Sequence, residues 1–210
     1  SVGGLCYIDF QDPDPQVVAI SYDFAKMGYQ LVVVNTGGSH DDLTPAYAAI
    51  PQEMKAVAQC FGQPDLRSVL PERFMRKLPM IREELKGQNA DRAILRAAHY
   101  FAENNRVTHL VQTLQQNDLP EFLRLIIDSG RSSFEYLQNI FATADRQELA
   151  LALMLSQQRL EGQGAWRVHG GGFAGTTLNF VPNAMLDSFV KEMETVFGQH
   201  SCNVLAIRPE

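Results

Sequence analysis

The most conspicuous segment of the sequence is a glycine-rich stretch, residues 167–177, which reads RVHGGGFAGTT. Four of six consecutive positions in it are glycine, namely Gly170, Gly171, Gly172 and Gly175. Glycine lets the backbone turn tightly and approach another group closely, and successive N–H groups in such a turn can accept an anion such as a phosphate. The segment therefore indicates either a phosphate-supporting loop or a tight glycine hairpin packed against another element.

Two well-known nucleotide-binding loops do not fit this segment. Its glycines at 170, 172 and 175 match GxGxxG literally, but that motif must open a helix, whereas the following residues, TTLNFV, have the composition of a strand. No Gly-Lys-Ser or Gly-Lys-Thr follows, which excludes a P-loop. A nucleotide-binding oxidoreductase is therefore disfavoured.

A second segment with chemical potential is residues 34–47, VNTGGSHDDLTPAY, where an apolar strand is expected to end in a polar loop before a helix. Loops at such places often carry ligand-binding groups. The side chains that can hydrogen-bond a polyol are Asn35, Thr36, His40, Asp42 and Tyr47. The alternative is structural: Asp42 or Thr44 caps the helix, the two glycines turn the chain, and His40 lies on the surface.

Charge and composition exclude several other functions. The 210 residues carry 18 basic and 24 acidic side chains, a net charge of −6, without the basic cluster that a nucleic-acid or anionic-membrane surface needs. Apolar runs such as 149–155 are far shorter than the roughly 18 residues of a membrane span. The three cysteines and five histidines are scattered, so we expect buried reduced thiols and no metal site.

The elements that must position these segments follow from periodicity and turn signals. Strands are expected at 5–10, 17–22 and 31–34, with a hairpin at the Asp-Pro-Asp-Pro turn between the first two. Helical spacing dominates 44–160, where Asp118 and Glu121 form a capping box. Prolines at 51, 64, 71 and 79 are expected to break its first part into short helices.

The last fifty residues return to strands, at 166–169 and 176–181, on either side of the glycine turn. A helix is expected at 186–197 and a closing strand at 203–208. Strands at both ends with helices between predict an α+β fold, with one mostly antiparallel sheet built from distant segments and a helical layer on one face.

Taken in order, these features resemble the C-terminal half of a galactokinase, a member of the GHMP family of small-molecule kinases. Three regions carry the resemblance: VGGLCYIDF at 2–10, the strand and loop from Leu31 to Tyr47, and the glycine segment. The last is similar to the family's third motif, a basic residue, an apolar residue and Thr or Ser before Gly-Gly-Gly-Phe-Gly-Gly, with His169 and Ala174 as departures. The resemblance covers essentially all 210 residues.

The resemblance implies a ferredoxin-like C-terminal domain over 1–210, whose first strands border an N-terminal kinase domain. ATP and the sugar would lie between the two domains, with ATP and Mg²⁺ held mainly by the N-terminal half. Tyr47 would contact the sugar, with Asn35 and Asp42 beside it. The nucleotide's phosphate site would be supported by Gly170, Gly171, Gly172, Phe173 and Gly175.

The resemblance also limits the activity expected of this chain. The catalytic aspartate would precede Ser1 by a few residues, so these residues alone are expected to be inactive, while the complete protein is expected to be a cytoplasmic, ATP-dependent sugar 1-kinase without nucleic-acid or membrane partners. Galactokinases typically have consecutive arginines shortly after this tyrosine, whereas AAIP follows Tyr47. Galactose is therefore the family default, beside related sugars. The alternative function is a non-catalytic galactokinase-like sensor or interaction protein.

Overall fold

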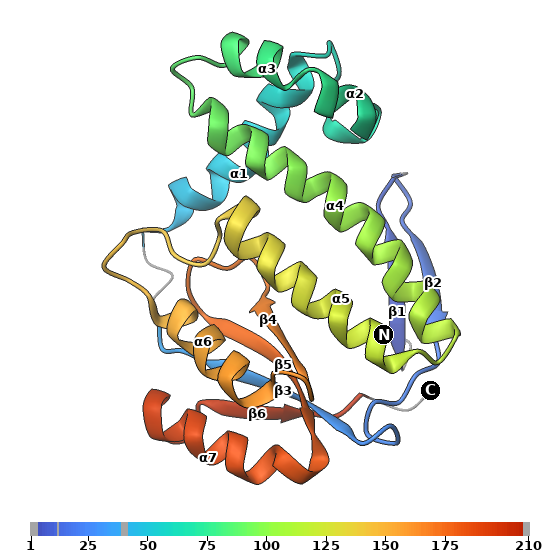
Figure 1. The fold of residues 1–210 in the computed structure, drawn as a ribbon, viewed down its shortest axis with the longest axis vertical. Helices are drawn as coiled ribbons and strands as arrows, with labels where there is room; N and C mark the ends of the chain where they lie inside the picture. Colours follow the sequence, from blue (N-terminus) through green and yellow to red (C-terminus); the bar gives the residue numbers. More distant parts are fainter. Residues whose placement is uncertain (1–3, 12, 39–41, 208–210) are drawn as a thin grey trace.

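The computed structural model describes residues 4–11, 13–38 and 42–207 (Figure 1). Its strands are β1 (Leu5–Asp9), β2 (Gln16–Ile20), β3 (Tyr29–Asn35), β4 (Ala165–His169), β5 (Thr176–Pro182) and β6 (Cys202–Leu205). Its α-helices are α1 (Thr44–Gln59), α2 (Pro71–Arg76), α3 (Leu78–Glu84), α4 (Ala90–Gln115), α5 (Leu119–Ser132), α6 (Glu148–Leu160) and α7 (Leu186–Phe197). Short helical turns are η1 (Leu66–Ser68), the π-helical η2 (Ser133–Leu137) and η3 (Asn183–Met185).

The central sheet joins strands from both ends of the chain. Its order is β4-β5-β3-β6, and every neighbouring pair is antiparallel. The predicted α+β fold with an antiparallel sheet from distant segments is confirmed. The hairpin of β1 and β2 forms as expected but is a separate two-stranded sheet. The closing strand is shorter than the predicted 203–208 and ends at Leu205.

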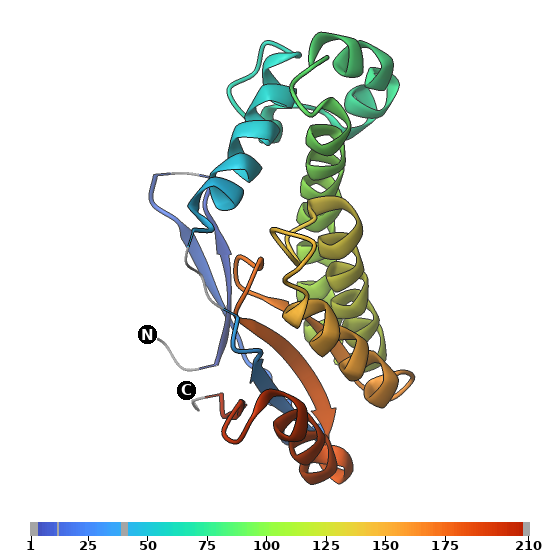
Figure 2. The same ribbon diagram turned by 90° about the vertical axis from the view of Figure 1, so that its left-hand side faces the viewer.

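The two faces of the sheet pack against different helices (Figure 2). Because side chains alternate along a strand, Val32 and Val34 of β3 lie on one face, where they join the core with α6 and α7. Leu31 and Phe180 lie on the other face, where they pack with Phe122 of α5. Helices thus contact both faces rather than the single one expected, because α5, besides packing against β4, reaches the face opposite α6 and α7.

The helical part follows its predicted signals with one exception. Asp118 caps α5 by accepting from the Glu121 N–H at 3.2 Å, although the Glu121 carboxylate pairs with Arg124 instead of closing the capping box. Pro71 begins α2 and Pro79 lies in the first turn of α3. The exception is Pro51, which lies inside α1 without ending it. Apolar side chains of α1 are buried in a core that α4 also lines, and this packing outweighs the loss of the backbone hydrogen bond that Pro51 cannot donate.

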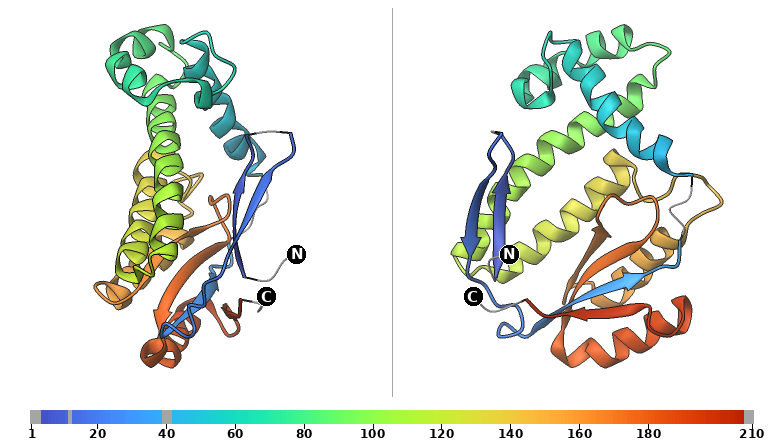
Figure 3. Two further views of the ribbon diagram at one scale, coloured as in Figure 1. Left: turned by 90° about the vertical axis from the view of Figure 1, so that its right-hand side faces the viewer. Right: turned by 180° about the vertical axis from the view of Figure 1, so that it is seen from behind.

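The β1–β2 hairpin has an apolar face that is open to solvent. Ile8 and Val17 are paired in the register, and their exposed fractions are 40% and 59%. Cys6 lies on the same strand and is exposed, so the expectation of a buried thiol is wrong for this residue. The hairpin stands beside α4, which β2 contacts (Figure 3), and its Asp9 pairs with Arg67 at 3.1 Å. Within the described ranges, no helix combines the length and hydropathy needed to cross a membrane.

Candidate functional site

The glycine-rich segment forms the connection between two antiparallel strands. His169 of β4 pairs with Thr176 of β5, and the residues between them turn through positive φ at Gly170, Gly172 and Gly175 (+72°, +79° and +93°). A strand follows the loop, as expected, so the GxGxxG spacing does not mark a dinucleotide fold. Phe173 also has a positive φ of +61°, which a non-glycine residue adopts only when its surroundings hold it there.

Asn139 is the residue that holds the loop from behind. The Phe173 N–H donates to the Asn139 carbonyl at 2.5 Å, and Asn139 Nδ2 donates to the Gly171 carbonyl at 3.0 Å. The approach is so close that a Cβ on Gly172 would lie 2.0 Å from the Asn139 carbonyl oxygen. Asn139 Oδ1 is buried and has no hydrogen-bond partner in the described part of the chain. No local pattern marks Asn139, because its partners lie more than thirty positions away.

Tyr47 meets the glycine loop directly. Its hydroxyl donates to the Gly172 carbonyl at 2.7 Å, and its ring packs edge-on against Phe173 with 5.2 Å between centroids. A Cβ on Gly171 would lie 2.8 Å from Tyr47 Cε1, so only glycine fits beneath the ring. Burial raises the pKa of the Tyr47 phenol above its usual value, which keeps the hydroxyl protonated and able to donate. The structure therefore brings together the two segments that the sequence singles out.

The other predicted sugar-site residues, Asn35 and Asp42, are both exposed. Asn35 is exposed at the end of β3, and its Oδ1 accepts from the Gly37 N–H at 3.0 Å. The neighbouring Thr36 contacts the glycine loop, because its N–H and Oγ1 both donate to the Gly175 carbonyl, at 2.9 and 2.8 Å. Asp42 is exposed with a φ of +61°. His40 lies outside the described residues.

The alternative in which Asp42 or Thr44 caps the first helix is wrong. The N-cap of α1 is Leu43, and among the described residues no side chain makes a capping hydrogen bond there. Leu43 is buried against Phe173 and Ala174, so packing on the glycine loop places the start of this helix. Tyr47, in the first turn, is consequently positioned by the loop that it contacts.

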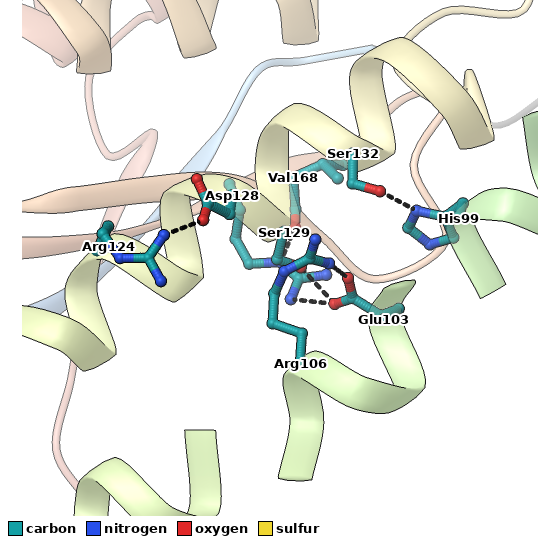
Figure 4. A network of polar contacts seen from close by, with 9 residues as sticks. His99, Glu103, Arg106, Arg124, Asp128, Ser129, Ser132 and Val168 are labelled. Carbon is teal, nitrogen blue, oxygen red and sulfur yellow. Dashed lines mark hydrogen bonds and ion pairs between the residues drawn. The ribbon is translucent and has the colours of Figure 1, made fainter. Parts of the chain in front are cut away.

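A polar network behind β4 ties the strand to α4 and α5 (Figure 4). Glu103 of α4 contacts Arg106, Ser129 of α5 and, at 3.6 Å, Arg167 of β4. Arg167 Nε donates to the Val168 carbonyl at 3.1 Å, and burial lowers the pKa of the Arg167 guanidinium. This strand carries the glycine loop, so the network fixes one end of that loop to the helical layer.

His99 belongs to the same network, where its Nδ1 lies 2.9 Å from Ser132 Oγ (Figure 4). Burial lowers the pKa of His99 despite the nearby Glu103 carboxylate. Gly130 lets α5 approach β4 closely, because a Cβ there would lie 3.0 Å from the Trp166 carbonyl oxygen. Asp128 pairs with Arg124 at 2.5 Å.

The site's polar groups are suited to binding rather than to proton transfer. They are a phenol, a threonine hydroxyl, amide groups and loop carbonyls. Among the described residues, no group of three or more His, Cys, Asp or Glu side chains is placed to hold a metal ion. The arrangement can orient a hydroxylated ligand beside a backbone loop, and the loop is open at Gly170, where a Cβ would meet no atom within 4 Å.

Comparison with known proteins finds galactokinases. No protein-family model matches the chain. It is 32% identical over 181 residues to the galactokinase of Glaesserella parasuis, which covers 85% of this chain and 44% of that protein. It is 31% identical over 163 residues to the galactokinase of Actinobacillus pleuropneumoniae serotype 5b, covering 76% of this chain and 39% of that protein. The chain thus spans about two fifths of the length of these relatives.

Solved structures show the same fold at lower sequence identity. A galactokinase of Lactococcus lactis in complex with galactose superposes with a TM-score of 0.67 at 19% identity, over 93% of this chain and 48% of that one. A mevalonate kinase of L. major in complex with R-mevalonate superposes with a TM-score of 0.58 at 15% identity, over 99% of this chain and 50% of that one.

Proposed function

Because this chain resembles the C-terminal part of galactokinases and has the GHMP kinase fold, we propose that it is the C-terminal portion of a sugar kinase. In the complete protein, the γ-phosphoryl group of ATP would pass to the anomeric hydroxyl of galactose or a related sugar. The observation that carries the proposal is the direct contact between Tyr47 and the glycine loop at Gly172.

Each part of this contact has a proposed role. Tyr47 contacts the sugar, with Asn35 and Asp42 at the border of the sugar site. The backbone of 170–175 supports the phosphates of ATP, and the open side of the loop at Gly170 is compatible with an approaching phosphate. Tyr47 and Phe173 pack on each other, so a shift of the glycine loop would also move the sugar contact. The sugar and the phosphates of ATP would thus keep a fixed position relative to each other.

The remaining chemistry is assigned to the half of the protein that precedes this chain. The catalytic aspartate and the main ATP and Mg²⁺ ligands would lie there, as the resemblance to galactokinases, of whose length this chain spans about two fifths, implies. When bound, Mg²⁺ neutralises the charge that develops on the transferred phosphoryl group. The present residues bind and orient, and they are inactive alone.

The open face of the hairpin is the proposed contact with that kinase domain. Phe10, Val17 and Ile8 are exposed apolar residues, with Phe10 as much as 73% exposed. Contiguous exposed apolar side chains generally mark an interaction surface. We assign residues 1–210 to one domain, whose first two strands border the preceding domain, and we assign the complete protein to the cytoplasm.

A non-catalytic sensor remains the second candidate, because two loop positions depart from the family motif. Ala174 is buried beside Leu43 and Phe173, and its Cβ lies 3.3 Å from the position of a Cβ on Gly38. His169 is exposed, with Nδ1 at 3.2 Å from Thr176 Oγ1. Both residues therefore make contacts within this chain.

The experiment is an assay of ATP-dependent phosphorylation over a panel of hexoses, with this chain alone and with the complete protein. We expect turnover only in the complete protein. Turnover by the short form would contradict the division of roles between the two halves. A complete protein that binds a sugar but never phosphorylates one would favour the sensor.

In the complete protein, Tyr47→Phe is expected to raise the KM for the sugar by about fivefold to tenfold. The reason is that the sugar loses the Tyr47 hydroxyl oxygen as a hydrogen-bond acceptor. The turnover number should change less, since the ring still packs on Phe173. Tyr29→Phe is the matched control, because the Tyr29 hydroxyl likewise donates to a backbone carbonyl, that of Gln163, at 2.8 Å, and Tyr29 begins β3 at the end opposite Asn35. Steady-state kinetics check the result, and an unchanged KM for Tyr47→Phe would remove this residue from the sugar site.

A further inference from the structure

A pocket of about 840 Å³ lies next to the glycine loop, between α1, the start of α4 and the η2 turn. Phe173 forms part of its wall, whereas Tyr47 is not in the lining. The pocket is therefore distinct from the proposed sugar contact, although the two share Phe173. Its volume lies within the range of small-molecule sites in proteins.

The walls of this pocket are mainly apolar and include unburied aromatic rings. Its apolar lining includes Ala46, Ala49, Phe134, Ile140, Phe141 and Phe173. Phe134 and Phe141 form an edge-on pair with 6.3 Å between centroids, yet they are 43% and 36% exposed. Two large aromatic side chains left partly in water beside a pocket gain apolar burial when a flat ring enters it.

The polar part of the lining contains two arginines that share one buried carboxylate. Arg92 and Arg96 both line the pocket, and both bind the single carboxylate of Glu53, at 2.5 and 2.8 Å. Glu135 also lines the pocket, so two guanidinium groups stand beside two carboxylates, but Glu135 is exposed to solvent whereas Arg96 is buried.

Arg96 is the group best placed to bind an anion in this pocket. Its side chain is 3% exposed, Nη1 donates to Glu53 and Nε donates to the Leu137 carbonyl at 3.2 Å. Within the described ranges its Nη2 has no hydrogen-bond partner. Burial lowers the pKa of Arg96, although the Glu53 carboxylate acts to raise it. A second anion beside Arg96 would offset part of the free-energy cost of burying the charged guanidinium.

We propose that this pocket binds a small organic anion in which a planar apolar ring carries one carboxylate. The ring lies among Phe134, Phe141 and Phe173, and the carboxylate accepts from Arg96. This assignment follows from the apolar walls, the aromatic pair at the surface and the buried Arg96, whose Nη2 has no hydrogen-bond partner among the described residues, and it does not depend on the proposed kinase activity.

The test uses 2-naphthoate as the probe and isothermal titration calorimetry on the complete protein. We expect saturable one-to-one binding, with the neutral analogue 2-naphthamide at least about tenfold weaker because it lacks the charge that the buried arginine recognises. Equal binding of acid and amide would overturn the anion assignment. Tighter binding of the cation 2-naphthylmethylamine would do the same, since it would show that Glu135 dominates the pocket.

Two variants locate the probe. Ala49→Phe fills the pocket from α1 and should abolish binding, whereas Ala144→Phe, at an exposed position outside the lining, should leave the dissociation constant unchanged. Phe141→Ala removes one partly exposed ring and should weaken binding about tenfold without a large cost in folding. Circular dichroism confirms that each variant is folded, and full binding by a folded Phe141→Ala protein would place the probe elsewhere.

Discussion

Replacing Gly172 with alanine is expected to destabilise the protein by at least about 3 kcal/mol and to reduce sugar phosphorylation about a hundredfold. The added Cβ would lie 2.0 Å from the Asn139 carbonyl oxygen and 2.6 Å from Asn139 Nδ2, and a backbone atom cannot move aside as a flexible side chain can. The φ of +79° adds strain of its own. Because the Gly172 carbonyl also accepts from Tyr47, any displacement reaches the proposed sugar contact.

Gly170→Ala is the matched control for this prediction. Gly170 has a similar φ of +72°, but a Cβ there would meet no atom within 4 Å. Only the backbone strain remains, which is about 1 kcal/mol. Urea denaturation of both variants, with initial rates in the complete protein, separates the two effects. If the two variants lose equal stability, the close approach of Asn139 to the loop is not what constrains Gly172.

Glu53→Ala is expected to lower the free energy of unfolding by about 3 to 5 kcal/mol, because it leaves a buried guanidinium without its counter-ion. Glu53 is 8% exposed and Arg96 2%, whereas Arg92 is partly exposed and can be hydrated when it loses its partner. Thermal and urea unfolding measure the loss. The same variant should leave the secondary structure of the sheet unchanged, since Glu53 lies on α1 and pairs with two residues of α4 rather than with a strand.

Two further variants test whether the loss comes from the unpaired charge. Glu53→Met combined with Arg96→Met removes both buried charges and should restore most of the stability, because apolar groups of similar size replace a buried ion pair at little cost. Asp91→Ala breaks an ion pair with Arg82 whose side chains are about 70% exposed, and it should leave the midpoint nearly unchanged. A double variant as unstable as Glu53→Ala would show that packing, not charge, explains the loss.

Local patterns were sufficient to predict most of the elements. Apolar periodicity placed α7 at its observed bounds, 186–197, and the Asp-Pro turn predicted the β1–β2 hairpin. Both signals depend on neighbouring residues, which is why they can be read from the chain. The break predicted at Pro51 is wrong because the local cost of an interior proline does not include the buried contacts that α1 makes with α4.

The site shows the same division between local and long-range information. Residue types and spacing singled out the glycine loop and the segment that ends in Tyr47, and their order along the chain pointed to a galactokinase-like protein. Only the tertiary structure decided that the Tyr47 hydroxyl binds the Gly172 carbonyl. It also decided that Asn139, which is distant in the sequence, supports the loop, and that the N-cap of α1 is Leu43. These contacts join segments separated by up to 125 positions, and packing among such segments leaves no periodic signature in the sequence.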